Sequence, residues 1–178
     1  MFNGFDYSNF KELDNTGKYH LIKDGANLML ATEDTKRRYM KHSQDVKNLY
    51  TLCNGVVNNL VKDKCLFIIS VKSFISKITN TGKLDVSEIN NTVGKLLEDA
   101  IHEDELLNLG ELTRGNSLEL LSDSILRKLR AMKDKNVAAE VLSRAIKTTI
   151  GDIGKINLTL QEKFSTKFNK IVDMYNER

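Results

Sequence analysis

Residues 65–78 read CLFIISVKSFISKI, the most apolar stretch in a chain of 178 residues. Its large apolar side chains recur three or four residues apart, which is the spacing of one face of an α-helix. That face comprises Phe67, Val71, Phe74, Ile75 and Ile78. The β-branched residues also suit a strand, but the segment 57–78 is longer than strands usually are. We therefore expect a helix over residues 57–78.

The composition favours helices along the whole chain. Proline is absent, although average usage of about 5% predicts roughly nine, and there are only 10 glycines. An all-β sandwich needs many turns, so this composition argues against one. Helical spacing continues on both sides of residues 57–78 and predicts an all-α bundle of about seven helices. The other helices are expected near residues 19–31, 33–53, 85–100, 118–132, 136–154 and 159–175.

Three of the expected helices have marked sets of apolar residues, and those of the first and the last are predicted to face inward. They comprise Leu21, Leu28 and Met29 in the first, Tyr39, Val46, Leu49 and Tyr50 in the second, and Leu160, Phe164, Phe168, Ile171, Val172 and Tyr175 in the last. Thr32 is expected to cap the second helix, because acidic residues follow it in the first turn. The pairs Asp85/Glu88 and Thr159/Glu162 form capping-box patterns. Before the first helix, Phe2, Phe5 and Phe10 are expected to pack from an extended lead-in.

The length fits one helical domain over residues 1–178, or two packed subdomains over 18–80 and 85–178. No apolar run approaches the roughly 18 residues that span a bilayer. Residues 1–6 lack the basic and apolar regions of a signal peptide. Two cysteines, Cys53 and Cys65, are too few for a disulfide framework. We therefore expect a cytoplasmic protein that does not contact membranes.

Charge is unevenly distributed although the net charge is only +3. Residues 1–84 carry net +5, residues 85–124 carry net −8, and residues 125–170 carry net +7. The acidic block therefore lies between two basic ones. Attraction within the chain and separate faces for different partners both explain this pattern.

A search for reactive groups predicts no catalytic, cofactor-binding or metal-binding residue. Each of the four Gly-Lys pairs lacks the following Ser or Thr that a phosphate-binding loop requires. The acidic run 102–105 is read as a solvated turn, because four consecutive residues cannot all face one ion. No local motif places a base beside Cys53, which is read as a buried structural thiol.

Two groups of basic residues are the candidate contacts with a partner or with phosphates. Lys163, Lys167 and Lys170 recur at i, i+4 and i+7 in the last helix. Arg127, Lys128 and Arg130 begin a second basic run that continues to Lys135. Either group could follow a phosphate backbone. Lysines also fill solvent-exposed helix faces simply because they are soluble and good helix formers, and we favour this explanation.

Most of the chain, in order, resembles the C-terminal helical region of the motor-nuclease (R) subunit of bacterial type I restriction enzymes. The N-terminal part of the resemblance rests on Ala26-Asn27-Leu28-Met29, Thr32, Asp34, Lys36, Arg38-Tyr39 and Leu52-Cys53. The C-terminal part rests on Met132, Lys135-Asn136, Ala138, Glu140, Leu142, Ile150, Asn157, Phe164-Ser165, Tyr175 and Arg178. The chain departs from the family pattern at Lys133, where a proline is usual, and at Leu160, where a Gln is usual.

The resemblance implies that the parent subunit is a DNA translocase and endonuclease that uses ATP and magnesium. Its helicase and nuclease domains would precede this region, so we expect Met1 to begin a fragment. The fragment would be non-catalytic and would dock the motor onto the modification and specificity subunits, contacting DNA weakly or indirectly. A stand-alone helical nucleic-acid-binding or adaptor protein is the alternative, supported by the two basic groups.

Overall fold

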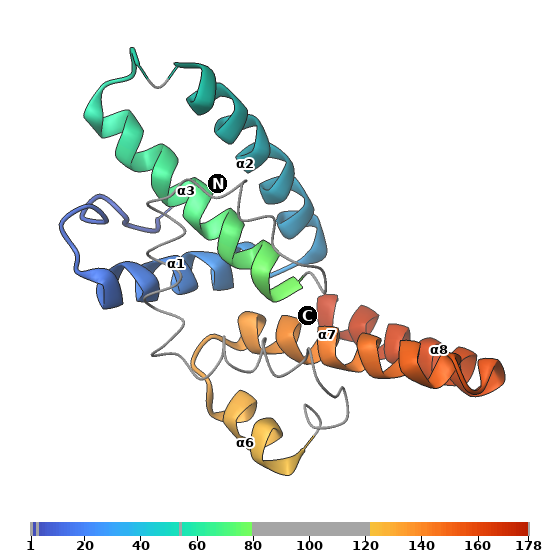
Figure 1. Cartoon of the computed structure of the whole chain (residues 1–178). Helices are drawn as coiled ribbons and strands as arrows, with labels where there is room; N and C mark the ends of the chain where they lie inside the picture. The colour runs from blue at the N-terminus through green and yellow to red at the C-terminus, as the bar shows by residue number, and fades with distance from the viewer. Residues whose placement is uncertain (1, 3, 54, 80–121, 178) are drawn as a thin grey trace.

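The computed structural model describes residues 2, 4–53, 55–79 and 122–177, and every regular element in these ranges is a helix (Figure 1). The helices are α1 (Asn15–Met29), α2 (Glu33–Cys53), α3 (Asn59–Thr79), α6 (Asp123–Ala131), α7 (Lys135–Gly154) and α8 (Leu158–Asn176). The predicted all-α class is confirmed. The helix expected over 85–100 and the acidic run 102–105 lie outside the described residues.

The core forms around α3, which packs against α1, α2 and α7. All five residues of its predicted face are buried, and Phe67 and Phe74 are fully enclosed. The N-terminal aromatic residues cover Phe67 as expected, with ring centroids 5.1 Å away for Phe2 and 5.3 Å for Phe10. Gly25 lets α1 approach closely, because a Cβ there would lie 3.0 Å from the Phe67 ring.

Two helical hairpins extend in different directions from this core (Figure 1). The pair α2 and α3 forms one hairpin, and the pair α7 and α8 forms the other. The base of α7 contacts α1 and α3, whereas α8 packs chiefly against α7. The second hairpin is therefore held to the core through α7, and much of α8 remains at the surface.

The buried face of α1 differs in part from the sequence prediction, and α2 buries only part of its apolar residues. In α1 the buried side chains include Tyr19, Ile22 and Met29, while Leu28 is 39% exposed. The helix begins at Asn15 and is capped by Asp14. Its buried residues recur every three or four positions from Tyr19 through Ile22 and Ala26 to Met29, and Leu28 lies off this face. In α2 the outer end lies beyond the core, so Leu49 is exposed although Tyr39 is buried.

Two expected helix caps have different outcomes. The backbone N–H of Thr35 donates to Thr32 Oγ1 at 3.1 Å, which confirms Thr32 as a cap. The predicted capping box at Thr159 is wrong, because α8 begins one residue before Thr159. Asn157 caps it instead, accepting from the Leu160 N–H at 3.0 Å.

Candidate functional site

A pair of asparagines joins α1 to the start of α7. The side-chain oxygen of Asn27 accepts from the backbone N–H groups of Asn136 and Val137, at 2.9 and 3.4 Å. Asn136 Nδ2 returns a hydrogen bond to the Asn27 carbonyl at 2.8 Å. The N-cap residue Asp134 makes no side-chain capping bond, so Asn27 caps α7 from another helix. This satisfies N–H groups that the first turn of a helix leaves without an internal partner.

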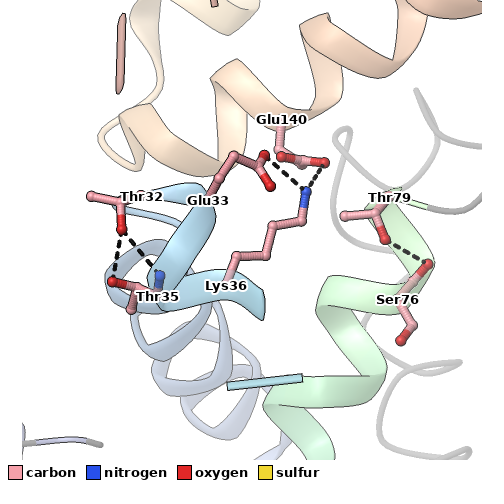
Figure 2. A network of polar contacts seen from close by, with 7 residues as sticks. All are labelled: Thr32, Glu33, Thr35, Lys36, Ser76, Thr79 and Glu140. Carbon is pink, nitrogen blue, oxygen red and sulfur yellow. Dashed lines mark hydrogen bonds and ion pairs between the residues drawn. The ribbon is translucent and has the colours of Figure 1, made fainter. Parts of the chain in front are cut away.

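Two ion pairs strengthen the same junction. Lys36 on α2 reaches Glu140 on α7 at 2.7 Å and its own neighbour Glu33 at 3.5 Å. Figure 2 shows the Lys36 ammonium group between these two carboxylates. Lys23 on α1 lies 3.5 Å from Asp134, and both side chains are largely shielded from solvent. Partial burial limits the screening of these two pairs by salt.

The junction also includes the C-terminal end of α8. The hydroxyl of Tyr175 donates to Asn136 Oδ1 at 3.1 Å, so one asparagine contacts both α1 and α8. We call the set Lys23, Asn27, Lys36, Asp134, Asn136, Glu140 and Tyr175 the polar seam. Five of its members, all except Lys23 and Asp134, are residues on which the family resemblance rests. The seam therefore gives those residues a structural role, because they fix the α7–α8 hairpin on the core.

No pattern in the sequence predicts the polar seam. Its hydrogen bonds from α7 to α1 and α2 join residues 104 to 110 positions apart, and no helical period or charge run links such distant segments. The only signal in the sequence was that five seam members all belong to the resembling segments: Asn27, Lys36, Asn136, Glu140 and Tyr175. A pattern of matched residues does not show which of them touch, so the pairing required the fold.

Among the described helices of the C-terminal half, α8 exposes the largest number of large apolar side chains. Phe168 is buried against α7, as predicted, and the Lys147 ammonium lies 6.0 Å from its ring centroid. The prediction that the whole aromatic stripe faces inward is wrong, because Phe164 is 42% and Ile171 59% exposed. A helix that packs against one neighbour buries only a narrow stripe, and the remaining apolar side chains stay in solvent.

The six basic candidate residues all have exposed side chains. Lys163, Lys167 and Lys170 lie on α8, on the side away from the Phe168 contact. Arg127, Lys128 and Arg130 lie on α6. The two groups thus belong to different helices, and the α8 lysines are interleaved with exposed apolar residues.

A pocket of about 440 Å³ opens between the end of α3 and α7. Its lining residues are Thr79, Glu140, Ser143, Arg144, Lys147 and Thr148. Arg144 Nη1 donates to the backbone carbonyls of Lys77 and Ile78, at 3.3 and 3.4 Å. A cation near the last carbonyls of a helix opposes the negative end of its dipole. Arg144 therefore binds two carbonyls in the last turn of α3 and fixes α7 against this helix.

Within the described ranges, no group of three or more His, Cys, Asp or Glu side chains is arranged to hold a metal ion. Cys53 is exposed, so its interpretation as a buried thiol is wrong: α2 ends there, outside the core. Cys65 is partly buried, and this burial raises the pKa of its thiol. None of the helices in the described part of the chain combines the length and the apolar character needed to cross a membrane.

Comparison with known proteins gives one match. A family described as "Type I restriction enzyme HindI endonuclease subunit-like, C-terminal" matches residues 1–178. No curated protein and no solved structure matches the chain.

Proposed function

The chain belongs to the family of type I restriction enzyme HindI endonuclease subunit-like C-terminal regions, and from this we propose that it is the assembly region of such a subunit. In this role the region is non-catalytic and docks onto the modification and specificity subunits of the restriction complex. ATP-dependent translocation and cleavage of DNA then belong to other parts of the parent endonuclease subunit, where ATP and magnesium would bind.

The observation that supports docking best is the outward apolar side of α8. Phe164, Ile171 and Met174 are 42, 59 and 61% exposed. Exposed apolar side chains that lie together on a surface often mark a site of protein association. The polar seam ties α8 and α7 to the core, so this surface is held in place before a partner arrives. Such preorganisation lowers the entropy cost of binding.

Nucleic-acid binding is the second candidate function, and the exposure of all six basic residues favours it. The composition of the α8 surface argues for protein instead. Its lysines alternate with Phe164, Ile171 and Met174, which a phosphate backbone cannot cover. Protein–DNA interfaces are more polar and more positively charged than this surface. We therefore favour docking onto protein.

The proposal is tested by titrating the chain against the purified modification–specificity complex and measuring the dissociation constant. We expect Ile171→Glu to abolish or strongly weaken binding, because it places a charge in the centre of the apolar surface. Leu52→Glu is the matched control, since Leu52 is 82% exposed on the other hairpin. Absence of binding by the unchanged chain, or equal binding by both variants, would contradict the proposal.

A further inference from the structure

The exposed apolar residues of α8 follow the spacing of a coiled-coil seam. Leu160, Phe164, Ile171 and Met174 are separated by four, seven and three residues. In heptad notation Phe164 and Ile171 occupy a positions, while Leu160 and Met174 occupy d positions. Lys167 occupies the d position between them. All of these side chains are exposed, so the seam is available to a second helix.

Lysines flank one side of this seam, and the other side faces α7. Lys163 and Lys170 fall on g positions, next to Phe164 and Ile171. The e positions carry Phe168, which is buried against α7, and Tyr175, which bonds to Asn136. A partner helix that packs on this seam therefore meets the basic side chains of Lys163 and Lys170 on the side away from α7. Charges at e and g positions decide which helices pair, because opposite charges attract across the seam.

We infer that the partner of α8 is an amphipathic helix whose apolar stripe is flanked by Asp and Glu side chains. The inference rests on the proposed docking function and names the chemistry of the surface that α8 recognises. The apolar stripe of the partner covers Phe164 and Ile171, and its carboxylates meet Lys163 and Lys170. Lys167 interrupts the apolar seam, which sets the register at a cost in affinity.

A second copy of α8 does not supply the required carboxylates. In an antiparallel pair the g positions face each other, so Lys163 and Lys170 would oppose lysines. In a parallel pair they would face e positions, which hold Gln161, Phe168 and Tyr175 and therefore no carboxylate. Glu162 and Asp173, the acidic residues of this helix, fall on f and c positions on its opposite side. The partner is therefore a different helix.

The first experiment uses two synthetic helical peptides as probes of the full chain. Both carry Leu at a and d; one has Glu at e and g, the other Lys. We expect the acidic peptide to bind at least about tenfold more tightly at low salt, because close like charges are strongly disfavoured. Lys163→Glu combined with Lys170→Glu should reverse this preference, and Lys167→Leu should tighten binding of the acidic peptide. Lys41→Glu combined with Lys64→Glu is the matched control, since both lysines are exposed on other helices.

Equal binding of the two peptides, or a preference that the double reversal on α8 leaves unchanged, would overturn the inference. A second experiment separates it from the proposed function. A photo-crosslinking residue replaces Ile171, and the chain is mixed with the modification–specificity complex. Crosslinks to an acidic amphipathic helix of that complex support the inference. Crosslinks to a basic or non-helical surface of the complex overturn the inference and leave docking standing. Crosslinks only to DNA, to a second copy or to residues 85–111 overturn both.

Discussion

At the scale of single residues, Asn27 makes the connection on which the placement of α7 depends. Its side chain accepts two backbone N–H groups from a helix more than a hundred residues away in the sequence. Capping by a side chain normally comes from the residue before the helix. Here the capping residue belongs to α1, so the cap of α7 and the contact between two helices are the same interaction.

We predict that Asn27→Ala lowers the free energy of unfolding by about 1–2 kcal/mol, because it removes a helix cap and leaves N–H groups without an acceptor. Asn27→Asp retains the acceptor oxygen and places a negative charge at a helix N-terminus, where it is favourable. The free energy of unfolding of the aspartate variant should therefore stay close to that of the unchanged protein. Urea unfolding of the three proteins measures this difference. An alanine variant as stable as the aspartate variant would show that Asn27 does not cap α7.

The burial of Tyr39 should make the stability of the protein fall with rising pH in the alkaline range. Its hydroxyl donates to the Ile68 carbonyl at 2.7 Å, and burial raises the pKa of the phenol well above 10. The unfolded chain ionises this group near pH 10 while the folded chain does not. The contribution of Tyr39 to stability is thus complete below pH 10 and is lost as the pH rises above it.

Tyr39→Phe should cost about 1 kcal/mol at neutral pH through loss of the hydrogen bond. Above pH 10 the difference between the two proteins should shrink, because phenylalanine cannot ionise. Unfolding midpoints measured from pH 7 to pH 11 test this, with Tyr50→Phe, on a half-buried residue, as the control. A difference that stays constant across that range would contradict the assignment.

At the scale of elements, α8 shows how one helix divides its apolar residues between the fold and a partner. Phe168 packs against α7, and Phe164, four residues earlier, is 42% exposed. The two side chains have the same chemistry and lie one turn apart. Only their position relative to α7 distinguishes them, so they form a matched pair for experiment.

We predict that Phe168→Ala lowers the free energy of unfolding by about 3–5 kcal/mol, because it leaves a cavity between α7 and α8. Phe164→Ala should cost less than about 1 kcal/mol, since an exposed side chain leaves no cavity. Thermal and urea unfolding of both variants measure the two values. Similar losses for both would mean that the inward and outward sides of α8 are wrongly assigned.

The sequence predicted the helices better than it predicted their surroundings. The α3 face from Phe67 to Ile78 is buried as expected, because an apolar face at helical spacing has little alternative to burial. For α8 the same spacing predicted that Phe164 and Ile171 are buried, and both are exposed. Periodicity identifies an apolar side of a helix, but it does not show whether this chain or another protein covers it. The six basic residues were placed on helices correctly, and their partners stay a prediction.

At the scale of the whole molecule, the polar seam and the core of α3 together determine where the two hairpins point. The seam lies where α1 and α2 meet α7, so it acts at the base of the second hairpin. A small change in the angle of α7 at this base therefore displaces the N-terminal end of α8 most, because that end lies farthest from the core. The division into subdomains 18–80 and 85–178 stays a prediction. The contacts of α7 with α1 and α3 nevertheless cross that boundary.

The basic groups predict weak binding to DNA that depends on salt. Each lysine that neutralises a phosphate contributes a slope near −0.9 to the logarithm of affinity against the logarithm of salt concentration. Lys163, Lys167 and Lys170 thus contribute at most about three contacts, without sequence preference. We expect negligible duplex binding at physiological salt, and the triple Lys→Ala variant should bind as weakly. Micromolar or tighter binding that the triple variant loses would favour the nucleic-acid candidate instead.

The central claim is that this chain docks the endonuclease subunit onto its partners, and competition tests it most directly. The chain is added in excess to the modification–specificity complex before the full endonuclease subunit, and ATP-dependent DNA cleavage is measured. If the chain occupies the docking site, cleavage falls as its concentration rises, while Ile171→Glu has no effect and Leu52→Glu inhibits like the unchanged chain. Cleavage that stays constant at saturating concentrations of the chain would contradict the claim.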